Sequence, residues 1–194
     1  MKINGPGESS LLLLKVIKVL EKFKIPYAII GAFAVSFYGL VRASLDADCV
    51  ISIEGKEKKL GQFLASLRKD ALKVELRRGD SSDPIRCMIN IEDKFRNRVD
   101  LLTGIRGMRE DVYEREVQAR FMNESIKIIS VEDLVAMKIY AGSVKDLQDV
   151  TGILQISAGR IDLFLLRKLT RQYGKKEVEL LENILLKAGG GGEV

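Results

Sequence analysis

Residues 29–51 read IIGAFAVSFYGLVRASLDADCVI, and this stretch decides the fold. The apolar run from Tyr27 to Ile30 predicts a short strand, which ends at Gly31. A short helix is expected next, over about Ala32 to Tyr38. Ser44 to Ile53 then alternates between apolar and polar residues, as a strand with one buried face does. The stretch therefore predicts a strand, a tight turn, a helix and a second strand.

Two aspartates, Asp46 and Asp48, are expected on the polar face of the second strand. Residues two apart on a strand project to the same side, where like charges repel, so a stable fold needs a reason to keep both. A Mg²⁺ ion supplies one, because it binds carboxylates together with water and substrate phosphate. The alternative for each aspartate is a solvated residue at the edge of a strand.

Asp100 is a third candidate of the same kind. It lies between Val99 and Leu101, which should face the core, so its carboxylate should lie on the polar face of its own strand. Three carboxylates from two strands can hold two metal ions about 4 Å apart, the arrangement used for in-line phosphoryl chemistry.

Gly31 stands where the first strand meets the short helix. A glycine there allows backbone N–H groups and the helix N-terminus to approach a phosphate closely. The alternative is that Gly31 only closes a tight turn.

The composition narrows the classes of protein. The 194 residues are 46% apolar and 30% charged, which is typical of a globular domain and excludes wholesale disorder and a multi-span membrane protein. The longest leucine run, from Leu11 to Leu14, is too short to span a bilayer. The two cysteines, Cys49 and Cys87, lie in apolar runs, which argues against a disulfide framework. We therefore expect a cytoplasmic protein with no membrane segment.

Histidine is absent, which excludes Ser-His-Asp triads, Cys-His dyads and histidine-bound zinc. Any chemistry must use carboxylates, lysines, hydroxyls and a bound cation. The net charge is +5, and residues 56–109 contain 14 Lys or Arg against 8 Asp or Glu. A basic middle third suits phosphate groups or nucleic acid, and it equally suits solvated strand and helix edges.

Hydrophobic periodicity predicts the remaining elements, and together they indicate an α+β fold. Helices are expected at Ser9 to Lys24, capped by Ser9 or Ser10, and at Lys56 to Lys69, Arg109 to Ala119, Val144 to Ile156, Asp162 to Tyr173 and Lys176 to Lys187. Strands are expected at Leu72 to Arg77, Ile85 to Glu92, Arg98 to Leu102 and Ile126 to Ile129. We expect a mixed β-sheet core flanked by helices over residues 1–129, a C-terminal helical bundle over 130–188 and a disordered tail over 189–194.

Four charged residues outside the strands are further candidates. Lys138 lies near the centre of the apolar face of a helix over Val131 to Gly142, whose start at Ser130 resembles a capping box. It either extends out of the core or reaches into a pocket where the helix meets the sheet. Lys145 and Asp149 have the i, i+4 spacing of an exposed salt bridge. Arg42 either contacts a nucleotide or neutralises the carboxylates.

These motifs resemble the nucleotidyltransferase superfamily, which has the polymerase-beta-like fold. Its signature is a glycine pair or Gly-Ser after a strand, then Asp-x-Asp, then an Asp on a neighbouring strand. The run is also similar to the small AbiEii-like nucleotidyltransferases, whose Gly…Gly…Arg-x-Ser/Thr-x-Asp-x-Asp pattern matches Gly31, Gly39, Arg42, Ser44, Asp46 and Asp48. Residues 130–150, SVEDLVAMKIYAGSVKDLQDV, resemble a second motif of that group at Lys138, Lys145, Asp146 and Asp149.

The resemblance implies an enzyme that transfers a nucleoside monophosphate from a nucleoside triphosphate to an acceptor hydroxyl. Two Mg²⁺ ions would be bound by Asp46, Asp48 and Asp100, with Asp100 also acting as, or positioning, the base. The nucleotide would be held by Gly31, Ala32, Arg42, Ser44, Lys138 and Lys145. The implied acceptor is RNA, such as tRNA, or a protein, and the toxin members of the group imply a cognate antitoxin-like partner.

One position departs from the pattern, because Ala32 stands where the family has Gly or Ser. This departure supports a second hypothesis, a catalytically degenerate module of the same fold that binds nucleic acid or a protein partner.

Overall fold

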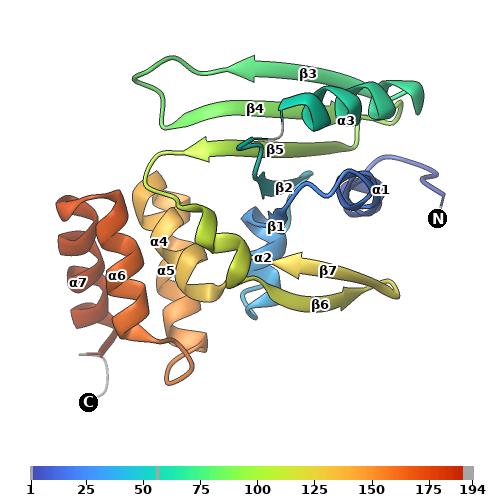
Figure 1. Cartoon of the computed structure of the whole chain (residues 1–194). Coiled ribbons are helices and arrows are strands. Elements are labelled where there is room, and N and C mark those ends of the chain that lie inside the picture. Colours follow the sequence, from blue (N-terminus) through green and yellow to red (C-terminus); the bar gives the residue numbers. More distant parts are fainter. Residues whose placement is uncertain (1, 56, 190–194) are drawn as a thin grey trace.

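The computed structural model describes residues 2–55 and 57–189, and in this part of the chain a seven-stranded mixed sheet forms the centre (Figure 1). The strands are β1 (Tyr27–Ile29), β2 (Asp46–Ile51), β3 (Lys73–Arg78), β4 (Ile85–Glu92), β5 (Arg98–Ile105), β6 (Val117–Phe121) and β7 (Glu124–Ile128). Their order across the sheet is β3-β4-β5-β2-β1-β7-β6. β2 runs parallel to β5, and β1 runs parallel to β7, while the other neighbours are antiparallel.

The α-helices of the described residues are α1 (Ser9–Lys22), α2 (Gly31–Phe37), α3 (Glu57–Lys69), α4 (Val131–Ala141), α5 (Val144–Ile156), α6 (Leu163–Tyr173) and α7 (Lys175–Gly189). The last four pack on one another and form the group of orange and red helices in Figure 1. The α+β fold predicted from periodicity is confirmed. Gly189 ends α7, whereas residues 190–194 of the predicted tail lie outside the described residues, as does Lys56.

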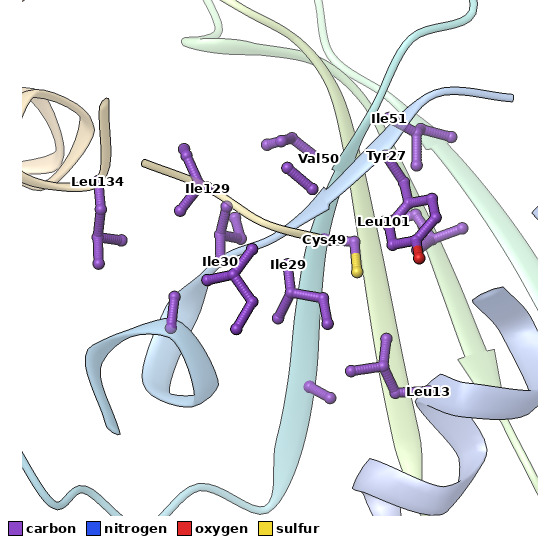
Figure 2. Packing of buried hydrophobic residues seen from close by; sticks show 14 of the residues in the cluster. Leu13, Tyr27, Ile29, Ile30, Cys49, Val50, Ile51, Leu101, Ile129 and Leu134 are labelled. Carbon is purple, nitrogen blue, oxygen red and sulfur yellow. The ribbon is translucent and has the colours of Figure 1, made fainter. Parts of the chain in front are cut away.

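The core lies on both sides of the central strands. On β2, Ala47, Cys49 and Ile51 are buried and face α1, as the predicted alternation requires. Figure 2 shows Leu13 of α1 on the side to which Cys49 points, while Leu134 of α4 lies on another flank of the cluster. Because α1 and α3 cover one face with apolar side chains, the polar side chains of β2 and β5 are left on the opposite face.

The predicted helix over Arg109 to Ala119 is wrong. A single 3₁₀ helix, η1, spans Glu110–Glu114, and the chain then enters the strand β6. β6 and β7 form a hairpin whose two turn residues, Met122 and Asn123, both have positive φ. Pairing with β7 and the packing of the Phe121 ring against Phe33, at 5.1 Å, override the local helical pattern.

The predicted serine cap of α1 is also wrong. Glu8 is the residue at the N-cap, and it caps no N–H group with its side chain. Ser9 is buried, and its hydroxyl donates to the Leu45 carbonyl at 2.6 Å and accepts from the Arg98 amide at 3.1 Å. Ser9 therefore joins α1 to the entries of β2 and β5, which carry the candidate site. Ser130 does cap α4, since its hydroxyl accepts from the Asp133 amide.

Gly142 ends α4 in the left-handed conformation, with φ +65° and no atom closer than 3.6 Å to a built Cβ. We expect Gly142→Ala to lower the free energy of unfolding by about 1 kcal/mol, because an alanine Cβ disfavours this backbone region. Gly61→Ala is the matched control. It lies inside α3 with open space around it, so alanine should raise stability by about 0.5–1 kcal/mol there. Urea unfolding of both variants checks the prediction, and a stabilised Gly142→Ala would contradict it.

No helix of the described residues is long and apolar enough to cross a membrane.

Candidate active site

The three predicted aspartates lie on adjacent parallel strands. Asp46 and Asp48 are on β2 and Asp100 is on β5, and the register places Asp48 opposite Asp100. Adjacent strands are about 4.8 Å apart, so these two carboxylates leave one face of the sheet as immediate neighbours. The strand periodicity seen in the sequence thus brings all three aspartates to one face.

Each carboxylate has a different environment. Asp46 is half-buried and accepts a hydrogen bond from the Ser44 hydroxyl at 2.6 Å. Asp100 is buried and accepts from the Asn90 amide at 2.7 Å, while the Arg98 guanidinium lies 3.4 Å from its other oxygen. Asp48 has no hydrogen-bond donor among the described residues. The carboxylate in the middle of the group is therefore the least satisfied.

Asp48 packs directly on Gly31. A Cβ built on Gly31 would lie 2.1 Å from Asp48 Oδ2, and the glycine has φ +63°. The glycine thus serves two needs, a left-handed backbone at the start of α2 and room for the carboxylate. The Ile30 amide donates to the Asp48 carbonyl at 2.9 Å and fixes this contact.

The electrostatics of Asp48 follow from this crowding. Its pKa is raised to about 6, first by burial and then by the negative charges of Asp46 and Asp100, against a smaller opposing effect of Lys138 and Arg42. A cation bound at this face would offset the repulsion between Asp48 and the other two carboxylates.

Lys138 is buried on α4, and its ammonium reaches into the site. It donates to Asp146 Oδ1 at 2.9 Å and to Asp149 Oδ2 at 2.7 Å. Burial lowers the pKa of Lys138, against the raising effect of its hydrogen bond with Asp146. Hydrogen bonds from Ser143 and Lys138 in turn lower the pKa of Asp146, although burial acts in the opposite direction. Lys138 therefore does not extend out of the core to solvent; it borders a cavity where α4 meets the sheet.

Asp149 joins this group to the loop before β2. The Arg42 guanidinium donates to the same Oδ2 atom of Asp149 that accepts from Lys138. The predicted exposed salt bridge between Lys145 and Asp149 is wrong, because Asp149 is buried and is already bound to those two cations. Lys145 is exposed, with no ion pair in the described part of the chain.

Two cavities divide the remaining predicted residues. A cavity of roughly 430 Å³ lies against the sheet and α4 and is bordered by Gly31, Asp48, Lys138 and Asp146 and otherwise by mainly apolar side chains. A second cavity, of roughly 420 Å³, is lined by Ala32, Arg42, Ser44 and Asp46, and also by Phe33, Phe37 and Phe121. The structure therefore places Gly31, Asp48 and Lys138 at the first cavity and Ala32, Arg42, Ser44 and Asp46 at the second.

One residue of the site was missed by sequence reasoning. Asn90 holds Asp100, and only the β4–β5 register, which pairs the two residues, reveals it. The resemblance named Asp149, while the i, i+4 spacing offered Lys145 as its partner; in the structure Asp149 is buried on α5 and accepts from Lys138.

The described residues contain no group of three or more His, Cys, Asp or Glu side chains gathered closely enough to hold a metal ion. Asp46 and Asp100 are turned toward their own donors, Ser44 and Asn90. The donor set nevertheless suits a hard divalent cation, since all three ligands are carboxylates and they share one face.

Comparison with known proteins gives the fold. No family model matches the sequence, and no curated protein matches it either. ANT(2'')-Ia in complex with adenylyl-2''-tobramycin is similar in structure, with a TM-score of 0.58 and 13% identity over 84% of this chain and 98% of that one. A solution structure of the antibiotic-resistance factor ANT(2'')-Ia also has a TM-score of 0.58, at 13% identity over 89% of this chain and 94% of that one.

A third similar structure is that of the putative nucleotidyltransferase TM1012 of Thermotoga maritima. Its TM-score is 0.54 at 16% identity, and the match covers 78% of this chain and 95% of that one. The likeness extends over nearly the whole of these proteins. The chain therefore has the nucleotidyltransferase fold.

Proposed function

We propose that this protein is a Mg²⁺-dependent nucleotidyltransferase, which transfers a nucleoside monophosphate from a nucleoside triphosphate to an acceptor hydroxyl. The observation that carries the proposal is the pairing of Asp48 with Asp100 across parallel strands, with Gly31 beneath Asp48 and Lys138 across the same cavity. Paired carboxylates beside a glycine turn and a buried lysine match what such a reaction requires.

In the proposed reaction the acceptor oxygen attacks the α-phosphorus. A new P–O bond forms, the bond from that phosphorus to the oxygen bridging to the β-phosphate breaks, and pyrophosphate leaves. The hydroxyl proton passes to Asp100 or to a water that Asp100 positions. Asn90 and Arg98 hold Asp100 in place for this role.

Mg²⁺ would be held by Asp46, Asp48 and Asp100, and when bound it would neutralise phosphate charge at the reacting group. The chain itself supplies the remaining positive charge. Lys138 is bound to Asp146 and Asp149, so a triphosphate must draw this ammonium partly away from the α5 carboxylates. The same two carboxylates keep Lys138 pointed into the cavity before the nucleotide arrives.

The nature of the acceptor is the finer part of the proposal. The complex with adenylyl-2''-tobramycin shows a nucleotidyl group on a small molecule in a protein of this fold. For this chain, the basic residues 56–109 favour RNA, such as tRNA, over a protein hydroxyl. A toxin role, an antitoxin-like partner, the AbiEii-like subgroup and a cytoplasmic location stay predictions of the sequence, as does the boundary near residue 129.

A label-transfer assay tests the proposal. The protein is incubated with each α-labelled nucleoside triphosphate, Mg²⁺ and a cell extract, beside the Asp46→Ala/Asp48→Ala variant. We expect label in a macromolecular acceptor that disappears in the variant and in the presence of a chelator. Label retained by the variant would contradict the site.

The rival, a degenerate module that only binds, predicts a different pattern. It gives no label with any nucleotide, and its binding to nucleic acid weakens steeply with salt and ignores Asp46→Ala. Ala32→Gly and Ala32→Ser then test whether this one residue accounts for the lost activity.

A further inference from the structure

One face of the β3–β4–β5 part of the sheet is open. On β4 the buried residues are Cys87, Ile89 and Ile91, which face the core under α1 and α3. The residues between them, from Arg86 to Glu92, are half-buried or exposed. We call the other side the open sheet face and define it by the outward residues Lys73, Glu75, Arg77, Arg86, Met88, Asn90, Glu92, Arg98 and Leu102.

The open sheet face is continuous with the three aspartates. The registers place Glu75, Asn90, Asp100 and Asp48 in one row across β3, β4, β5 and β2. A chain lying across this face would reach the reacting carboxylates without leaving the sheet. The face therefore has the position of a surface that presents the acceptor.

The charge of this face is positive. With Asp100 of β5 included, its four cations stand against three acids, and Glu75 is already bound by Lys73 at 2.8 Å and by Arg77 at 3.4 Å. The Arg98 guanidinium forms an ion pair with Asp100 at 3.4 Å. The Arg98 side chain is 47% exposed, so part of its positive charge still faces solvent. A polyanion complements this distribution.

Arg86 is the cation with the clearest geometry. It is exposed, and it has no ion pair or side-chain hydrogen bond among the described residues. Gly104 of β5 lies beside it, and a Cβ there would meet the Arg86 Cβ at 2.6 Å and the Arg86 Cδ at 3.3 Å. Gly104 thus allows the arginine to lie across the sheet toward β5. The guanidinium therefore stays without an internal partner, two rows from Asn90 and Asp100 in the β4–β5 register.

Apolar surface lies next to this cation. Met88 and Leu102 are paired in the β4–β5 register, one row from Asn90 and Asp100, and both are half-buried. Flat apolar area beside a guanidinium suits the face of a base with its phosphate, provided that the base is not covered by a partner strand.

We propose that the open sheet face binds a single-stranded nucleic acid and leads its hydroxyl end to Asp100. The proposal rests on the proposed function, because the bound strand is the acceptor. Arg86 contacts the phosphodiester backbone, and Met88 with Leu102 contacts unpaired bases. RNA and DNA share this chemistry, so the choice between them is made by which oligonucleotide takes up label.

Fluorescence anisotropy with a labelled 20-nucleotide single strand tests the face. We expect Arg86→Gln to weaken binding about 5- to 10-fold and to reduce the slope of log affinity against log salt by about 0.7, the value for one phosphate contact on a single strand. Lys59→Gln is the matched control, since it removes one exposed cation from α3 on the opposite face and should change binding less than about twofold. A duplex of the same sequence should bind at least about fivefold more weakly.

The outcomes separate this proposal from the proposed function. Equal loss in Arg86→Gln and Lys59→Gln, or a duplex that binds as well as the single strand, overturns the open sheet face as the binding surface. So does label transferred to a protein or small molecule while the single strand fails to bind. Strand binding that depends on Arg86, without transfer of label to any acceptor, upholds the face and overturns the enzyme. Transfer to RNA or to DNA that falls with Arg86→Gln upholds both.

Discussion

Replacing Asp48 by asparagine is expected to reduce nucleotidyl transfer at least about a thousandfold, because the variant loses a carboxylate charge at the metal and phosphate. Asparagine keeps the size of the side chain above Gly31, so the fold should be unchanged. Initial rates of label transfer at saturating Mg²⁺, compared with circular dichroism spectra, measure both effects. Glu179→Gln, an exposed change on α7, is the control. A loss below tenfold would contradict the role of Asp48.

The same variant should be more stable than the parent at neutral pH when Mg²⁺ is removed by a chelator. The pKa of Asp48 is raised from 3.8 to about 6 in the folded protein, so folding favours the protonated form. The parent therefore bears no penalty below about pH 4 and an increasing one as the pH rises toward 6. Asp48→Asn should gain roughly 1–2 kcal/mol above pH 7, after allowance for solvent screening, and nothing near pH 4. Urea unfolding across this range measures the difference, and a gain that grows toward acid pH would refute it.

Gly31→Ala is expected to lower the free energy of unfolding by about 2–3 kcal/mol and transfer by at least about a hundredfold. The added Cβ would lie 2.1 Å from Asp48 Oδ2, so the carboxylate must move away from its position opposite Asp100. Unfolding curves and transfer rates give the two effects.

Gly55→Ala separates strain from contact. Gly55 has the same φ of +63° but nothing within 4 Å of a built Cβ, so its alanine bears only the backbone cost. We expect about 1 kcal/mol there and unchanged transfer. In an Asp48→Ala background, the loss of stability caused by Gly31→Ala should fall to the same value of about 1 kcal/mol. Equal effects of the two glycine changes in the parent would show that the contact with Asp48 does not matter.

The elements that sequence predicted well are those whose signals are local. β4 begins at Ile85 and ends at Glu92 as predicted, because apolar residues at every second position leave one choice of buried face. α5 spans Val144–Ile156 as predicted, with Ser143 accepting from the Asp146 amide as its cap. The prediction for residues 109–119 failed because their charged residues suit a helix. The β6–β7 hairpin that forms instead has a turn without glycine, so the sequence carries no glycine turn signal there.

The candidate site divides in the same way. The common face of Asp46 and Asp48 follows from the two-residue period of a strand, and Gly31 follows from its place before a helix. The partners of these residues do not follow, because they depend on register and helix docking. Spacing along α5 makes Lys145 a neighbour of Asp149, yet burial against α4 gives Asp149 to Lys138 at 2.7 Å. Tertiary packing decides which charged residues form ion pairs, and hydrophobic periodicity in the sequence does not reveal it.

The parallel pairing of β1 with β7 has a consequence for folding during synthesis. Ile29 pairs with Ile128, and Lys138 follows Ile128 in the chain, whereas the strands that carry Asp48 and Asp100 are both synthesised by Ile105. At about 5–20 residues per second, the ribosome adds the interval from Asp100 to Lys138 in about 2–8 s. For those seconds the nascent chain holds the aspartates of β2 and β5 without the ammonium of α4. The last helices to emerge thus complete the charge balance of a site whose acidic half is made first.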